Sequence, residues 1–117
     1  SIMPENRALN YKLAEVYIRQ NRPELAQPVL NRFLKNNPRD VNAWRLMQQV
    51  ASLDKKSPMH TINVLRYRAE VQFWSGFEEE AIKSLLHAQR LAKDNESMSA
   101  TIKTRLTQMQ KDRQFRA

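Results

Sequence analysis

Cysteine is absent from this chain of 117 residues, and glycine occurs only once, at Gly76. The absence of cysteine excludes a disulfide framework, a thiolate nucleophile and a cysteine-ligated zinc site. One glycine and five prolines supply little of the turn chemistry that β-hairpins need. No apolar run approaches the roughly 18 residues that span a bilayer, and the first residues show no signal-peptide pattern. Good helix formers such as Leu, Ala, Gln, Lys, Arg and Glu dominate instead, so we expect one all-α domain.

Side chains that could carry catalysis or hold a metal are scarce. His60 and His87 are the only histidines, and they stand in neither an H-E-x-x-H nor an H-x3-H arrangement. The sequence also lacks a glycine-rich phosphate loop and a G-x-S-x-G nucleophile elbow. Carboxylates mostly lie near Lys or Arg, as Glu15 and Arg19 do at a spacing of one helical turn. We therefore expect a chain that is not an enzyme, with no catalytic residue, no metal ligand and no cofactor-binding residue of its own.

A helical-repeat pattern occupies the stretch 13–38, LAEVYIRQNRPELAQPVLNRFLKNNP. It is close to the roughly 34-residue tetratricopeptide-repeat (TPR) pattern W-x2-L-G-x2-Y…A-x3-F…P, with Asn10 in the place of the Trp and Ala14 in the place of the Gly. Small side chains at Ala14 and Ala26 would allow two antiparallel helices to approach closely. The large residues that we expect to be buried between these helices are Leu13, Tyr17, Leu30 and Phe33.

Hydrophobic residues at helical spacing predict about six helices. Asn21 and Gly76 are suited to end helices, because both tolerate the left-handed backbone conformation. Asp40 is placed to cap a helix, and the Ser-Pro pair at 57–58 to begin another. Pro28 lies about one turn inside its helix, so we expect an irregular or kinked start there. The expected helices span about 5–20, 23–35, 40–53, 58–75, 78–92 and 96 onward.

A weaker copy of the first unit recurs 55 residues later, which superposes Ala14 on Ala69 and Ala26 on Ala81. That offset is longer than one repeat and shorter than two, so the middle repeat looks shortened and the fourth helix would partner both the third and the fifth. The polar, basic final helix suits a cap on the end of an α-solenoid, although it could instead hold an anionic partner. The expected fold is a TPR-like α-solenoid over 1–117, with repeat 1 at about 6–39, a truncated repeat 2 at about 40–61, repeat 3 at about 62–94 and a capping helix at about 95–114.

Repeats of this type offer a concave groove, which we expect to be lined by the first helix of each pair. Residues beside the buried stripe of those helices combine guanidinium groups with amides, which can bond a peptide backbone or a carboxylate. Arg45 and Arg66 carry the forked cations, although they could simply be solvated or could pair with Glu70. The predicted protein-binding residues are Tyr11, Lys12, Glu15, Arg19, Asn42, Arg45, Gln49, Asn63, Arg66 and Glu70.

The formal net charge of the chain is +8. This charge admits nucleic acid, an anionic membrane or an acidic protein surface as the partner. Lys and Arg are scattered over every expected helix, which favours a solvated basic face over a dedicated binding block. A basic helical nucleic-acid-binding domain is the alternative function, although no glycine-bearing helix-turn-helix unit stands out. A protein or peptide is the favoured partner and nucleic acid the less favoured one.

Four segments together resemble a narrower family. They are LAEVYIRQNRPELAQPVLNRFLKNNPRDVNAWRLM at 13–47, Tyr-Arg-Ala-Glu at 67–70, Gly-Phe-x3-Ala-Ile-x2-Leu at 76–85 and Thr-Arg-Leu-x-Gln-Met-Gln at 104–110. Over about residues 6–114 this combination is similar to the C-terminal repeat region of the β-barrel assembly-enhancing proteases. Members of that family are periplasmic H-E-x-x-H zinc metalloproteases of Gram-negative bacteria.

The resemblance implies that this chain is a non-catalytic TPR interaction domain located in the periplasm. It implies zinc and a catalytic domain elsewhere in a longer parent protein, so no zinc ligand or general base is assigned to any residue here. The implied role is the docking of substrates, or of a larger complex, in outer-membrane protein assembly and quality control. The implied partners are outer-membrane barrel proteins or their assembly complex, and the catalytic domain of the same parent chain.

Overall fold

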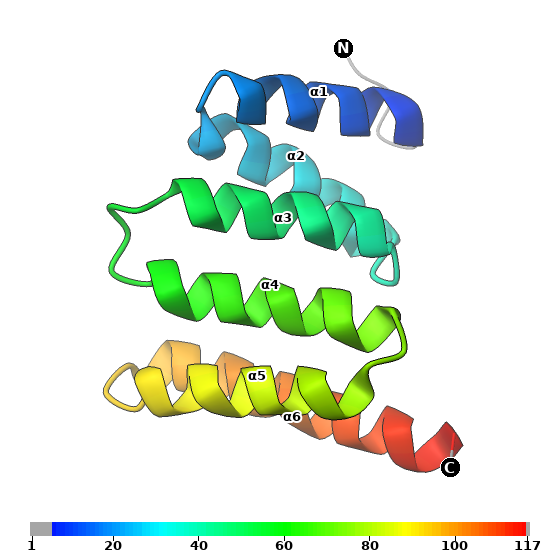
Figure 1. Ribbon diagram of the computed structural model, residues 1–117, viewed down its shortest axis with the longest axis vertical. Coiled ribbons are helices and arrows are strands. Elements are labelled where there is room, and N and C mark those ends of the chain that lie inside the picture. Colours follow the sequence, from blue (N-terminus) through cyan, green and yellow to red (C-terminus); the bar gives the residue numbers. More distant parts are fainter. Residues whose placement is uncertain (1–5, 117) are drawn as a thin grey trace.

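The computed structural model describes the chain from Asn6 to Arg116, with side chains up to Arg113. Over these residues it contains six α-helices and no strand. Consecutive helices run antiparallel and stack into a curved array (Figure 1). The predicted all-α, TPR-like solenoid is therefore confirmed. The helices are α1 (Arg7–Arg19), α2 (Pro23–Asn36), α3 (Val41–Leu53), α4 (His60–Trp74), α5 (Glu78–Leu91) and α6 (Glu96–Arg116).

Local side-chain chemistry sets several of the helix ends. Asp40 caps α3, because its carboxylate accepts the backbone N–H three residues on at 3.1 Å. Asn6 caps α1 in the same way, at 3.0 Å. Asn21 follows the end of α1 with a φ of 56°, and Gly76 follows the end of α4 with a φ of 95°. Both lie in the left-handed region, so these two residues end their helices as predicted.

The structure bears on two predictions made from proline residues. The fourth helix begins at His60, because the hydroxyl oxygen of Ser57 accepts the N–H of Met59 at 3.1 Å and closes a turn ahead of the helix. The expected start at 58 is thus wrong by two residues. At Pro28 the helix shows no break, since α2 runs without interruption over Pro23–Asn36, and a kink there stays a prediction. The ring of Pro28 is exposed to solvent, and the residues on the opposite face hold the helix in place by packing.

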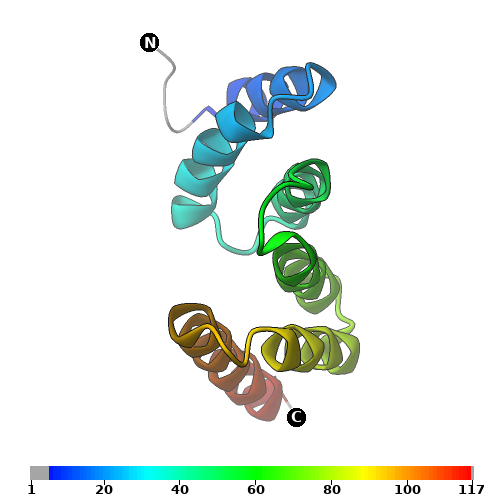
Figure 2. The same ribbon diagram turned by 90° about the vertical axis from the view of Figure 1, so that its left-hand side faces the viewer.

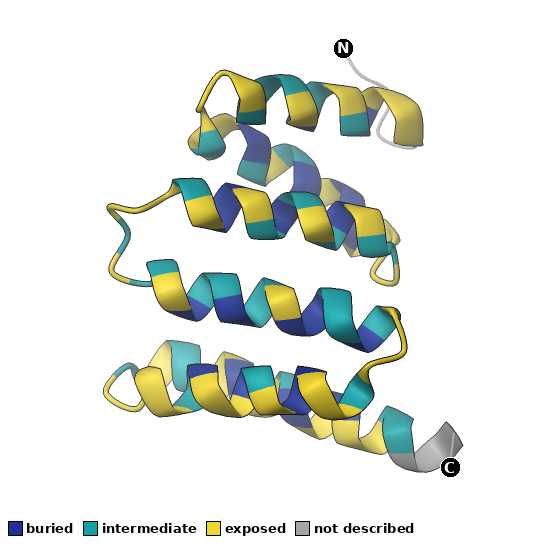
Figure 3. Ribbon diagram, viewed as in Figure 1, coloured by how far each residue is buried: buried dark blue, intermediate teal, exposed yellow. Residues whose placement is uncertain are grey.

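The first three helices enclose one hydrophobic core. Ala14 and Ala26 are 0% exposed, which allows α1 and α2 to pack as closely as the repeat pattern predicts. Of the large residues expected between the helices, Leu30 and Phe33 are buried, whereas Leu13 and Tyr17 are only half-buried. The reason is that α1 packs on α2 and α3 along a single face and leaves its other sides in solvent (Figure 3).

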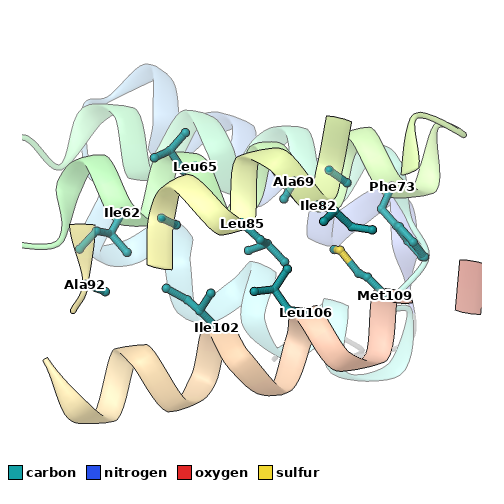
Figure 4. Packing of buried hydrophobic residues seen from close by; sticks show 12 residues of the cluster. Ile62, Leu65, Ala69, Phe73, Ile82, Leu85, Ala92, Ile102, Leu106 and Met109 are labelled. Atoms are coloured by element: carbon teal, nitrogen blue, oxygen red, sulfur yellow. The ribbon is translucent and has the colours of Figure 1, made fainter. Parts of the chain in front are cut away.

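The last three helices enclose a second core (Figure 4). Ala69 of α4 and Ala81 of α5 are 0% exposed, and they occupy the same two roles as the small residues of the first unit. Phe73 fills the end of this core beside Trp74. From α6 a stripe of residues at helical spacing closes the core from below, so α6 covers α5 as predicted for a capping helix. The stripe is Ile102, Leu106 and Met109.

α4 connects the two halves of the molecule, because it packs against α3 on one side and α5 on the other. Its residue Tyr67 packs on the N-terminal core, whereas Ile62 and Leu65 belong to the C-terminal core. This is the double role that the shortened middle repeat predicts. The consequence for the shape is visible in Figure 2, where the ribbons trace a C whose back is α3 with α4 and whose arms are α1 with α2 and α5 with α6.

Candidate protein-interaction cleft

A cleft of about 750 Å³ lies between the two arms of the C. It is lined mainly by the second helix of each successive antiparallel pair, α2, α4 and α6, together with the loop before α3 and Trp44. This volume falls within the roughly 300–1,000 Å³ that is typical of ligand clefts. The cleft can therefore take several side chains of a partner, but not a folded domain.

Aromatic rings form the apolar part of the cleft. Trp44 and Tyr67 stack with their ring centroids 6.0 Å apart and their planes at 28°. The indole N–H of Trp44 donates to the carbonyl oxygen of Pro38 at 2.8 Å, which fixes the ring. Farther along α4, Trp74 meets Phe73 edge-on at 4.9 Å. The three rings that line the cleft, Trp44, Tyr67 and Trp74, are only half-buried, so part of their apolar surface is open to a partner.

Cationic side chains surround these rings. The guanidinium of Arg39 lies 5.5 Å from the ring centroid of Trp74, and that of Arg66 lies 5.4 Å from the ring centroid of Tyr67. Such cation–π contacts hold the guanidinium in one place and leave N–H groups at its edge available. The four cations that line the cleft are Lys35 of α2, Arg39 of the loop, Arg66 of α4 and Arg105 of α6.

Glu70 is the single carboxylate among the residues that line the cleft, and its charge is already compensated. Its side chain is 8% exposed. Arg105 donates to it twice, from Nε to Oε2 at 2.7 Å and from Nη2 to Oε1 at 2.9 Å, and the indole N–H of Trp74 donates to Oε1 at 3.2 Å. The partner of Glu70 is thus Arg105, so the alternative that Arg45 or Arg66 pairs with it is wrong. The pair ties α6 to α4 and leaves the cleft with an excess of positive charge.

Three of the ten predicted binding residues lie together on α4. Arg66 and Glu70 line the cleft itself. Arg66 donates from Nη1 to the amide oxygen of Asn63 at 2.9 Å, so Asn63 orients the guanidinium. Asn63 also lines a second, much smaller pocket next to the cleft, which it shares with His60 and Tyr67. The predicted groove and the cleft thus share residues of α4.

The other seven predicted residues are not among those that line the cleft. Tyr11 of α1 donates its hydroxyl to Asp40, and its ring centroid lies 5.3 Å from that of Phe33. Burial raises the pKa of Tyr11 to about 12, and the hydrogen bond to Asp40 acts in the same direction. This residue fastens α1 to the start of α3. The remaining six are exposed on α1 and α3, and they are Lys12, Glu15, Arg19, Asn42, Arg45 and Gln49.

The difference arises because the groove was expected on the first, third and fourth helices, whereas α2, α4 and α6 line most of the cleft. The direction of curvature depends on how α4 packs between α3 and α5, and no local sequence pattern encodes it. Protein binding by the exposed α1 and α3 residues stays a prediction. Sequence reasoning missed Lys35, Arg39, Trp74 and Arg105. The one signal in the sequence is that Trp74 is one of only two tryptophans, and nothing in the sequence places Arg39 or Arg105 beside it.

The residues that the structure describes offer no metal site. Among them, no three His, Asp or Glu side chains lie close enough together to hold a metal ion. None of the helices between Arg7 and Arg116 combines the length and the apolar character that a membrane span requires.

Comparison with known families agrees with the repeat architecture. Residues 1–50, which include α1, α2 and most of α3, match the family described as Tetratricopeptide repeat. No solved structure matches the chain. Repeats of this family generally mediate protein–protein interactions and are typically non-catalytic. The family match over residues 1–50 and the six-helix solenoid together support a TPR-like architecture.

Proposed function

We propose that this chain is a non-catalytic protein-docking domain and that the cleft between α2, α4 and α6 receives a segment of its partner. The observation that carries the proposal is the cleft itself: about 750 Å³ of concave surface, with half-buried aromatic rings beside cations that are already oriented. Clefts that combine an apolar surface with a few well-placed polar groups are the usual form of a binding site. A TPR-like solenoid supplies the rigid frame that keeps such a surface in shape.

The proposed setting is a periplasmic zinc metalloprotease that acts in outer-membrane protein assembly and quality control. Its support is the resemblance of four segments, over about residues 6–114, to the repeat region of the β-barrel assembly-enhancing proteases. In that setting the zinc belongs to a catalytic domain elsewhere in the parent protein. The docking domain brings outer-membrane barrel proteins, or their assembly complex, to that catalytic domain.

Nucleic-acid binding is the second candidate function, because the chain has a net charge of +8 and its cleft is cationic. Single-stranded nucleic acids bind such surfaces by stacking bases on open aromatic faces. Here Tyr67 is stacked on Trp44, and the guanidinium of Arg66 also lies over the Tyr67 ring. The guanidinium of Arg39 lies over the ring of Trp74. Each ring thus already has a stacked or cationic neighbour, which leaves less of its face for a base and favours a protein partner. A salt titration with random duplex DNA separates the two functions, since binding that weakens steeply with salt indicates nucleic acid.

Site-specific photo-crosslinking in cells of the full-length parent protein tests the docking function. The probe is placed at Arg66 and at Arg39 in the cleft, and at Arg45 on α3 as the position outside it. We expect adducts to barrel proteins or to their assembly complex from the two cleft positions, and fewer from Arg45. Adducts from Arg45 alone would move the docking surface to the exposed face of α3. Adducts to the parent's catalytic domain alone would mean that the cleft regulates the protease within its own chain.

A further inference from the structure

We infer that the cleft selects an extended acidic segment, in which Asp or Glu side chains alternate with apolar ones. This inference rests on the docking function proposed above and adds the chemistry of the segment that docks. It follows from three features of the cleft, namely its uncompensated charge, the way its guanidinium groups are held and its apolar surface.

The charge of the cleft is uncompensated because its one carboxylate is unavailable. Glu70 is bonded twice by Arg105 and once by Trp74, which uses both of its oxygens. Lys35, Arg39 and Arg66 form no ion pair with any residue that the structure describes. A carboxylate brought in by a ligand is thus the natural partner for these three cations.

The two guanidinium groups are positioned before any ligand arrives. Arg39 rests over Trp74, and Arg66 rests over Tyr67 with one N–H already bonded to Asn63. These contacts restrict the two side chains before binding, which lowers the entropic cost of forming new hydrogen bonds. A stacked guanidinium presents its edge, and two N–H groups in one plane match the two oxygens of a carboxylate.

Because part of the cleft is apolar, we expect the ligand to carry apolar side chains as well as acidic ones. Pro38 is exposed and Trp44 is half-buried beside it, and both line the cleft together with the cations of the loop and of α4. An apolar side chain of the ligand that covers these residues would remove them from water, at about 25 cal/mol for each Å². Neighbouring side chains of an extended strand point in opposite directions. Because α2, α4 and α6 line the cleft from more than one side, the acidic and the apolar side chains of an alternating segment can both contact it.

The two tryptophans of the chain make the test free of labels, because both Trp44 and Trp74 line the cleft. Intrinsic fluorescence of the purified chain is titrated with a short peptide of alternating Glu and Leu. The same peptide with Gln in place of Glu, and an oligothymidylate as an equally anionic nucleic acid, are the comparison ligands. We expect the acidic peptide to change the tryptophan emission at the lowest concentration, and added salt to weaken this binding.

A pair of matched variants locates the binding. Arg66 and Arg45 each donate to an Asn three residues before them, and Arg45 lies outside the cleft. Arg66→Gln should weaken binding of the acidic peptide roughly tenfold, as expected for the loss of one charge-assisted hydrogen bond. Arg45→Gln removes the same charge and should change the affinity by less than about twofold.

Three results would overturn the inference. The Gln peptide could bind as tightly as the Glu peptide, or Arg45→Gln could cost as much affinity as Arg66→Gln, or the oligothymidylate could bind more tightly than either peptide. If any of these occurs while cleft positions still give protein adducts in cells, the docking function stands and the acidic ligand is wrong. If the acidic peptide binds but the cleft gives no protein adduct in cells, the docking function fails instead.

Discussion

The buried ion pair between Glu70 of α4 and Arg105 of α6 permits a prediction about which of the two side chains contributes more to stability. Arg105→Met removes the guanidinium but keeps an unbranched apolar side chain beside Phe73 and Trp74. Glu70 would then keep only the hydrogen bond from Trp74 for a carboxylate that is 8% exposed. Removal of one partner from a buried pair costs about 3–5 kcal/mol, because the other charge is left in a poorly solvated site. Arg105 itself is 24% exposed, so we expect the lower end, about 3 kcal/mol.

The opposite substitution should cost less. Glu70→Gln keeps an oxygen that accepts from Trp74 and Arg105, and the guanidinium of Arg105 can turn toward solvent because it is already partly exposed. We expect this change to lower the free energy of unfolding by about 1–2 kcal/mol. The control is Arg22→Met, which breaks the ion pair with Glu24 between side chains that are 53% and 59% exposed. Exposed pairs contribute about 0–1 kcal/mol.

Urea denaturation followed by far-ultraviolet circular dichroism measures all three changes against the parent chain. For a domain of this size, roughly 4 °C of melting temperature corresponds to each kcal/mol, so Arg105→Met should melt about 12 °C lower. The expected order of destabilisation is Arg105→Met, then Glu70→Gln, then Arg22→Met. If Arg105→Met costs no more than Arg22→Met, then the carboxylate of Glu70 is not held by this pair in solution. If Glu70→Gln costs the most, then the asymmetry argued from exposure is wrong.

Three further changes have definite expected outcomes. Gly76→Ala should lower the free energy of unfolding by about 1–2 kcal/mol, because φ is 95° although the added Cβ meets nothing within 4 Å; an unchanged urea midpoint would refute this. Pro28→Ala should raise the free energy of unfolding by about 1–3 kcal/mol, since a backbone N–H is restored inside α2. A lower urea midpoint would contradict that reasoning. The pKa of Tyr11 is raised to about 12 by burial and then by its bond to Asp40, so the folded chain keeps a proton that the unfolded chain releases at about pH 10. The stability due to Tyr11 is therefore complete below about pH 10 and is lost toward about pH 12, and urea midpoints of Tyr11→Phe should fall less over this range.

The helices were predictable because their signals are local. Asp40 caps α3 with its own side chain, and Asn21 and Gly76 end their helices through their own backbone angles. Ala14 and Ala26 were predictable for a related reason: the requirement for a small side chain at a close helix contact is met by one residue at a time. Each of these features depends on residues within a few positions along the chain.

The cleft was harder to predict because its chemistry is not local. Glu70 and its partner Arg105 are 35 residues apart, and the choice of Arg105 over Arg66 depends on where α6 lies when the solenoid is complete. Arg39 and Trp74 meet across the same distance along the chain. Sequence periodicity gives the buried face of a helix, but it does not say which of the remaining faces turns toward the inside of a curve.

The position of α6 determines the sign of the net charge in the cleft, in addition to covering the C-terminal core. Lys and Arg are scattered along the chain, and the sequence alone therefore favoured a merely solvated basic face. In three dimensions Lys35, Arg39 and Arg66 converge, and Arg105 of α6 removes the one carboxylate that would oppose them. Arg105→Met should consequently lower the affinity for the acidic peptide as well as the stability of the chain, because the carboxylate of Glu70 would then repel the peptide. If the folded variant binds the peptide as well as the parent does, the compensation of Glu70 is not what makes the cleft accept an acidic partner.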